Sequence, residues 1–293
     1  AWDSAYPLVD SGLFNEIRLD YSGDIDSLVT ATVPDYSTAR TLNHVKRNTL
    51  GVRYNAPRLL SDLSVQMEYF RAGIESPTWY RVAALQADVV AHSLGGVMAR
   101  GMSKVDGFYS VRNLKKGFFH KLITLGSTHL GTHHSLHLMS GDSDCTSNLA
   151  SFTGNYNLVS ATISGTTFNG AVFDQVGDGS LANASATLKR LHTPTVLRGG
   201  QVAPPLKAAF IAGGRTQGNS SEDVQTQCWW LRLACPLASD FISAHCSNAA
   251  WSGIFDNQGD DAVVPFLSAT DGGRPHTLFS GVVHGPGSVG RGS

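Results

Sequence analysis

The feature that most constrains the fold of this chain is a short apolar stretch that ends at a serine and leads directly into a glycine-rich helical pattern. Residues 87–91 read Ala-Asp-Val-Val-Ala, which predicts a short apolar strand, and residues 94–102 carry the apolar spacing of a helix. Only His92 and Ser93 lie between them, so the chain must turn sharply. Such a turn forces its serine into a strained backbone conformation with the hydroxyl exposed.

The neighbours of Ser93 fit this kind of turn. The residues two before and two after the serine must approach each other closely, and here they are the small residues Ala91 and Gly95. The following helix points its N-terminal N–H groups and the positive end of its dipole at the serine, so the N–H of Leu94 is a candidate oxyanion-hole donor. We predict Ser93 as a nucleophile; the alternative is an ordinary strand-to-helix turn without chemistry.

A serine nucleophile needs a histidine to accept its proton and an acid to orient that histidine. Where the nucleophile sits on a strand-to-helix turn of this type, the chain order is serine, acid, histidine. After Ser93 the chain offers a Gly-Asp-Asp-Ala-Val-Val-Pro segment that follows an apolar stretch. We assign its second aspartate, Asp261, as the acid, with Asp260 as the main alternative.

The base is chosen from eleven histidines. His192 and His245 precede both candidate acids, so the chain order excludes them. His276 lies in a polar turn before the last predicted strand, whereas His284 lies after that strand, where the loop that carries the base is expected. We assign His284 as the base and keep His276 as the alternative.

Four further segments predict strands, at residues 16–21, 121–125, 208–212 and 277–279, each with alternating or continuous apolar residues. A helix is predicted to begin at Asn55 as its cap and to end at Gly73. Its apolar face holds Leu59, Leu63, Met67 and Phe70. Strands that alternate with helices predict the α/β class, with a mostly parallel sheet flanked by helices.

The stretch from residue 132 to residue 202 breaks this alternation. It is rich in Ser, Thr, Gly and Asn, with scattered aromatic residues. A structureless loop of this length is uncommon in a compact domain. We therefore predict a cap or lid insertion at 132–202, and a core formed by 1–131 and 203–293.

Composition excludes some classes of protein. A net charge of −1 argues against a nucleic-acid-binding protein, which usually carries a strong basic excess. No apolar run approaches the roughly 20 residues of a membrane helix. Charged residues make up only 15 %, below the roughly 25 % of an average soluble domain, which favours an exported protein. The four cysteines allow three disulfide pairings, or four free thiols. They are Cys145, Cys228, Cys235 and Cys246.

Two groups of side chains raise the question of a metal. The first is a histidine cluster, made of His129, His133, His134 and His137. The second is a set of acidic residues that could serve calcium, made of Asp142, Asp144, Asp174 and Asp178. The histidines have no acidic residue between them, and the acidic residues do not follow a known calcium-loop pattern. We therefore predict no metal and no cofactor.

Several of these segments together resemble bacterial triacylglycerol lipases and the esterases related to the GPI-inositol deacylases. Residues 88–100 resemble the elbow of that group, with Ala91 in place of its usual glycine. Residues 122–132 resemble the next strand and its turn, with Thr128 in place of a proline. The Asp260-Asp261-Ala262-Val263-Val264-Pro265 and Val283-His284-Gly285 segments resemble the regions that carry the acid and the histidine.

This resemblance implies an α/β-hydrolase fold and a Ser93–Asp261–His284 triad that cleaves carboxylic esters through an acyl-enzyme. It also implies a small-molecule or lipid ester as substrate, with transient contact to a lipid interface. In that group a strand and its loop precede a segment like 1–4 and supply the second oxyanion donor, so we expect an incomplete domain. The alternatives are a catalytically impaired binding module, and an acyltransferase or amidase with the same triad.

Overall fold

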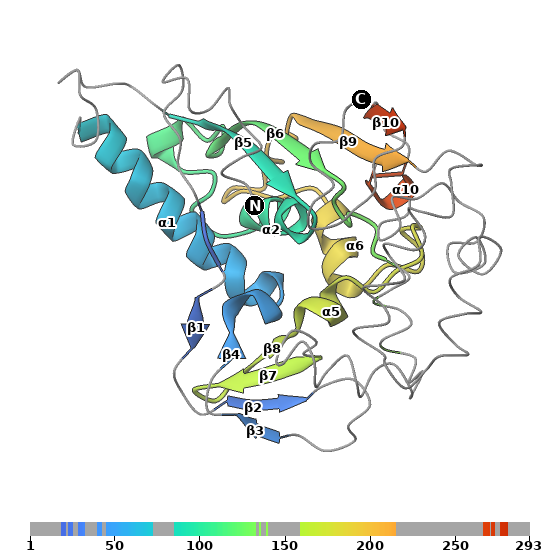
Figure 1. Cartoon of the computed structure of the whole chain (residues 1–293). Coiled ribbons are helices and arrows are strands. Elements are labelled where there is room, and N and C mark those ends of the chain that lie inside the picture. Colours follow the sequence, from blue (N-terminus) through green and yellow to red (C-terminus); the bar gives the residue numbers. More distant parts are fainter. Residues whose placement is uncertain are drawn as a thin grey trace, which may run out of the picture.

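The computed structural model combines one parallel β-sheet with two antiparallel sheets and several helices (Figure 1). The α/β class is therefore confirmed. The structure describes residues 19–21, 23–25, 29–32, 40–42, 45–72, 85–132, 135, 139, 159–214, 266–269, 271–272 and 276–280. Within these ranges, no helix has both the length and the apolar character that crossing a membrane requires.

The parallel sheet has the strand order β10–β9–β6–β5. Its members are β5 (Ala87–His92), β6 (Phe119–Leu125), β9 (Ala208–Gly214) and β10 (His276–Ser280). All three pairings are parallel, and β5 forms one edge of the described sheet. These strands confirm four of the five predicted ones, because short apolar runs bounded by Gly or polar turns suit a parallel sheet. Of the fifth, residues 16–18 lie outside the described residues and residues 19–21 do not form a strand.

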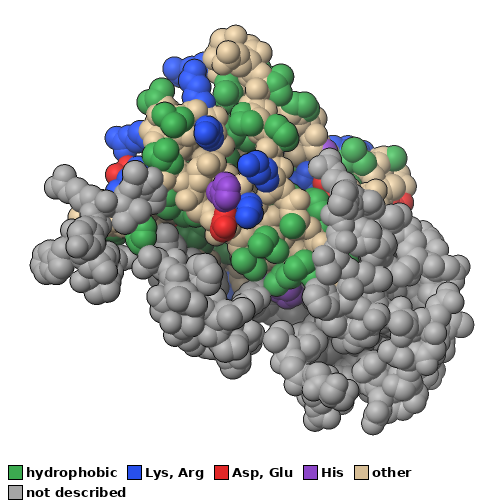
Figure 2. All heavy atoms as spheres, turned by 90° about the horizontal axis from the view of Figure 1, so that it is seen from above, with side chains coloured by type: hydrophobic (Ala, Val, Ile, Leu, Met, Phe, Trp, Pro, Cys, Tyr) green, Lys and Arg blue, Asp and Glu red, His purple; other side chains and the backbone are tan. Residues whose placement is uncertain are grey.

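Helices α1 (Val52–Ala72) and α2 (Leu94–Met102) lie side by side below the parallel sheet in Figure 1, and together with one face of the sheet they enclose the main core. Along β5, Val89 and Ala91 pack against this core, while Val90 points the other way and is 51 % exposed. Figure 2, the view of the molecule from above, shows hydrophobic side chains next to Lys and Arg side chains on this surface.

Helix α1 begins at Val52, so the prediction that Asn55 caps it is wrong. Asn55 is fully buried inside the helix, and its side-chain amide donates to the carbonyl oxygens of Arg47 and Leu50, at 2.8 Å each. The first N–H of the helix instead donates to the carboxylate of Asp174, 2.7 Å away and 122 residues later in the chain. A cap that comes from a distant segment leaves no signal next to the helix in the sequence.

The antiparallel sheet at the bottom of Figure 1 has the order β3–β2–β7–β8. It joins β2 (Val29–Thr32) and β3 (Arg40–Leu42) to the hairpin of β7 (Ser160–Ile163) and β8 (Thr166–Asn169). A smaller core lies against it, made of Val29, Ala31, Val45, Leu50, Tyr54 and Ala161. The short strands β1 (Asp24–Ile25) and β4 (Val45–Lys46) pair antiparallel as a separate two-stranded sheet.

The remaining elements are short. They are the 3₁₀ helices η1 (Arg47–Thr49) and η2 (Val111–Asn113), and the α-helices α5 (Ala171–Asp174), α6 (Ala186–His192) and α10 (Phe266–Ala269). Two of them fall in the predicted insertion, whose boundaries stay a prediction. Leu188 and Leu191 of α6 belong to the main core, and α6 contacts α2. The described part of residues 132–202 therefore packs directly against the helix that follows Ser93.

Candidate active site

Ser93 occupies the sharp turn between β5 and α2. Its backbone has φ 53° and ψ −131°, in the positive-φ region that residues other than glycine rarely adopt. Its N–H donates to the carbonyl oxygen of Leu125 at the end of β6, at 3.0 Å, and its own carbonyl accepts from the N–H of Gly96 at 3.1 Å. The sheet on one side and the helix on the other thus fix the turn in its strained conformation.

The small residues around Ser93 play unequal steric roles. A Cβ placed on Gly95 would lie 3.8 Å from the Cβ of Ala91, which is ordinary van der Waals contact. A Cβ placed on Gly96 would lie 2.2 Å from Oγ of Ser127 and 2.7 Å from its Cβ. Ala91 and Gly95 do approach each other, as expected, but Gly96 is the glycine that the packing of α2 against the loop after β6 requires.

Leu94 is the first residue of α2, so its N–H has no acceptor within the helix. The N–H groups of this first turn lie directly after Ser93, at the positive end of the helix dipole. An anion that forms next to the Ser93 hydroxyl would be stabilised there. The role of oxyanion donor assigned to Leu94 stays a prediction.

The proposed acid and base, Asp261 and His284, lie outside the described residues, and so does the alternative acid Asp260. The backbone of His276 begins β10. Because β5, β6, β9 and β10 are parallel, their carboxyl ends all point to the same side of the sheet, which we call its carboxyl edge. The chain that follows each strand starts at this edge. Ser93 follows β5 at that edge, and His284 lies a few residues beyond the end of β10.

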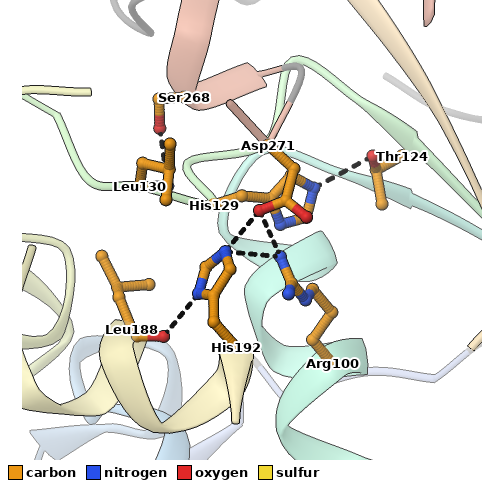
Figure 3. Close-up of polar contacts among 8 residues, drawn as sticks. All are labelled: Arg100, Thr124, His129, Leu130, Leu188, His192, Ser268 and Asp271. Carbon is orange, nitrogen blue, oxygen red and sulfur yellow. Dashed lines mark hydrogen bonds and ion pairs between the residues drawn. The ribbon is translucent and has the colours of Figure 1, made fainter. Parts of the chain in front are cut away.

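A buried polar cluster lies close to this edge, and sequence reasoning did not find it (Figure 3). Asp271, in the turn after α10, has a fully buried side chain. Its Oδ1 accepts from Nη1 of Arg100 on α2, at 2.9 Å, and from Nε2 of His192 at the end of α6. The available signal was Arg100, the one charged residue in an otherwise apolar helix, because a buried arginine needs an anionic partner.

The electrostatics of this cluster favour the ionised carboxylate. Burial by itself would raise the pKa of Asp271, but the hydrogen bond from His192 and the charges of Arg100, His192 and His129 outweigh burial. The pKa of Asp271 therefore lies well below the usual range of an aspartate.

The loop after β6 is held in place by contacts with β6, β9, α10 and the residue after α5. His129 is buried; its Nε2 lies 3.1 Å from Oγ1 of Thr124, and its ring meets Phe210 edge to face. The N–H of Leu130 donates to Oγ of Ser268 on α10, at 3.0 Å. Thr128, where the resembling proteins have a proline, donates to the side chain of Gln175 at 3.0 Å.

The metal alternatives find no support in the part of the chain that the structure describes. There, no group of three or more His, Cys, Asp or Glu side chains is arranged to hold an ion. Asp174 accepts hydrogen bonds from Val52, Asn169 and Thr187, and Asp178 accepts them from Ser180 and Asn183. His133, His134, His137, Asp142, Asp144 and the four cysteines lie outside the described residues.

Comparison with known proteins assigns no family to this chain. No protein-family model matches the sequence, and no curated protein matches it either. The assignment of a function therefore depends on the chemistry and geometry of the chain itself.

Proposed function

We propose that this chain is a serine hydrolase of the α/β-hydrolase type that cleaves carboxylic esters. The observation that carries the proposal is the backbone of Ser93, at φ 53° between a parallel strand and a helix. Positive φ alone does not single out Ser93, since Ser164 in an exposed turn has φ 51°. A nucleophile is supported by the combination of this backbone with a parallel strand directly before it and helix α2 directly after it.

In the proposed mechanism, His284 accepts the proton of Ser93 while its hydroxyl oxygen attacks the ester carbonyl. The negative charge that develops on the carbonyl oxygen is stabilised by the N–H of Leu94 and the N-terminal end of α2. Asp261 orients His284 and stabilises its imidazolium form. His284 then protonates the leaving alcohol, and a water activated by the same histidine releases the acyl group from Ser93.

The parallel sheet supports this arrangement, although β6 and β9 lie between β5 and β10 in the described sheet. Ser93 and His284 follow β5 and β10, whose carboxyl ends lie at the same edge of the sheet, where α/β proteins place their sites. The substrate class, an acyl or lipid ester, is proposed from the resemblance of the sequence segments to lipases and esterases. The interface contact proposed with it has the same basis.

The test is the hydrolysis of a p-nitrophenyl ester, together with covalent labelling by a fluorophosphonate. Ser93→Ala should abolish labelling and lower kcat by at least about 10⁴-fold, because the nucleophile itself is removed. The matched control is Ser164→Ala, since Ser164 is also a serine at positive φ, 51°, but lies exposed in the β7–β8 turn.

The control should leave both labelling and turnover at the level of the unmodified chain. Labelling of Ser93→Ala at the original rate would exclude Ser93 as the nucleophile. A chain that folds, hydrolyses no ester and takes no fluorophosphonate would favour the alternative of a binding module that retains the fold.

A further inference from the structure

Asp271 lies where three segments that are far apart in the sequence meet. Arg100 comes from the helix that follows Ser93, His192 from the end of α6, and Asp271 from the turn after α10 (Figure 3). The side chains of Arg100 and His192 are each only 10 % exposed, and that of Asp271 is not exposed at all. A single buried carboxylate oxygen thus links three elements of the fold.

His192 has polar contacts at both ring nitrogens. Its Nδ1 lies 2.8 Å from the carbonyl oxygen of Leu188, and its Nε2 contacts the carboxylate of Asp271. Nη1 of Arg100 lies 3.4 Å from the same Nε2 (Figure 3). The Asp271 carboxylate, the Arg100 guanidinium and the His192 ring therefore meet at one point, while the other ring nitrogen is fixed to the backbone of α6.

The turn after α10 places two successive residues at positive φ. Asp271 has φ 53°, and the next residue, Gly272, has φ 81°. Aspartate adopts positive φ more readily than most residues other than glycine, so this turn can present a side chain. The side chain is the carboxylate that holds Arg100 and His192.

A second contact fixes the same segment to the region of the elbow. Ser268 on α10 accepts from the N–H of Leu130, in the loop after β6, and the end of β6 in turn accepts the N–H of Ser93. The segment 268–271 is therefore attached both to α2, through Arg100, and to the loop after the neighbouring strand. In the sequence this segment lies between Asp261 and His284.

We propose that Asp271 is a positioning residue of the hydrolase site, which fixes the chain between the acid and the base onto the helix that carries the elbow. The inference rests on the function proposed above. Asp271 acts through Arg100 and His192, and it does not contact the substrate. Since a displacement of about 1 Å in a catalytic group can reduce the rate by about 10²-fold, loss of this link should lower turnover at the site.

The test compares Asp271→Asn with Asp174→Asn. Asparagine keeps the shape of aspartate and tolerates positive φ better than most residues, so the first variant removes mainly the charge. The second variant removes the other buried aspartate among the described residues, which accepts hydrogen bonds at the start of α1, away from the elbow. Active sites are counted with the fluorophosphonate, and kcat and KM for the p-nitrophenyl ester are then expressed per titrated site, well below the unfolding midpoint.

Asp271→Asn should lower kcat per titrated site by about tenfold or more, with KM within about twofold, as expected for a misplaced catalytic group. Asp174→Asn should leave kcat per titrated site within about twofold of the unmodified chain, even if it unfolds more easily. A full kcat per titrated site in Asp271→Asn would overturn the proposal, because a purely structural residue changes only the number of folded molecules.

If Asp271→Asn does not fold, His192→Gln replaces it as the test variant, since glutamine retains one neutral donor towards Asp271. A fall of about threefold or more in kcat per titrated site would support the positioning role, and an unchanged kcat would overturn it. Absence of both labelling and turnover in the unmodified chain would refute the hydrolase function together with this proposal, whereas normal turnover with an unaffected variant would refute the positioning role alone.

Discussion

Two buried aspartates in this molecule are stabilised in different ways. Asp174, at the start of α1, is fully buried and accepts from three neutral donors: the N–H of Val52 at 2.7 Å, Nδ2 of Asn169 at 3.1 Å and Oγ1 of Thr187 at 2.6 Å. Asp271, beside α2, accepts from the guanidinium of Arg100 and the imidazole of His192. Both carboxylates join segments that are distant in the sequence.

Their pKa values shift in opposite directions. Burial raises the pKa of Asp174, and the hydrogen bonds from Thr187, Val52 and Asn169 offset only part of that effect. At Asp271, burial also acts to raise the pKa, but the hydrogen bond from His192 and the nearby positive charges lower it by more. The neutral donors at Asp174 thus lower its pKa by less than burial raises it, whereas the hydrogen bond from His192 and the nearby positive charges at Asp271 outweigh burial.

The largest effect should come from removing the cation next to Asp271. Arg100→Met keeps most of the buried volume but removes the cation that donates to Asp271 at 2.9 Å, so the free energy of unfolding should fall by about 3–5 kcal/mol. Urea unfolding measures this change. The matched control is Arg112→Met, because Arg112 is 72 % exposed and pairs with Glu68 at 3.2 Å.

The control should cost less than about 1 kcal/mol, as exposed ion pairs usually do. Combining Arg100→Met with Asp271→Asn should recover part of the loss, since the unpaired buried charge is then removed as well. A cost for Arg100→Met no larger than that for Arg112→Met would show that the buried pair does not stabilise the fold.

An intermediate effect is expected where Asp174 meets α1. A Cβ on Gly51 would lie 2.0 Å from Oδ2 of Asp174 and 3.1 Å from the carbonyl oxygen of Asn169. Gly51→Ala should therefore displace the carboxylate from the N–H of Val52 and lower the free energy of unfolding by about 1–3 kcal/mol. The comparison variant is Gly95→Ala, whose Cβ meets only Ala91 at 3.8 Å.

Thermal unfolding should show Gly95→Ala to be neutral or stabilising by up to about 1 kcal/mol, because alanine favours the helix over glycine. Equal destabilisation by both substitutions would mean that general crowding, and not the position of the Asp174 carboxylate, explains the loss.

The smallest effect is the pH dependence of stability, and it has opposite signs at the two sites. Because the folded pKa of Asp271 is lowered, its contribution is present above the unfolded value of about 4 and is lost as the pH falls towards the folded value. Because the folded pKa of Asp174 is raised, ionising it costs stability as the pH rises from about 4 through that value.

Urea unfolding between pH 2 and 6 should separate the two carboxylates. The stability advantage of the unmodified chain over Asp271→Asn should shrink on acidification, and that over Asp174→Asn should grow. Parallel pH profiles for the two variants would contradict the difference in electrostatics between the sites.

The sequence alone determined the elements whose signals are local. The helix 94–102 has the predicted bounds, and the strands 87–91, 121–125, 208–212 and 277–279 appear with their ends shifted by one or two residues. Short apolar runs bounded by turns predicted the strands of the parallel sheet, including β5 at its edge, where Val90 is exposed. The turn at Ser93 was equally local, since its neighbours allow few other ways to join a strand to a helix. Asp261 and His284 remain assignments from the sequence.

Tertiary structure alone decided the features that depend on partners distant in the chain. Nothing near residue 52 indicates that α1 begins there, because its cap is the carboxylate of Asp174. Chain order excluded His192 as the base. It could not reveal that His192 contacts Asp271, which follows the insertion in the sequence. Periodicity in the sequence indicates which face of a helix or strand is buried. The burial of a charged side chain depends instead on which opposite charge the fold places next to it.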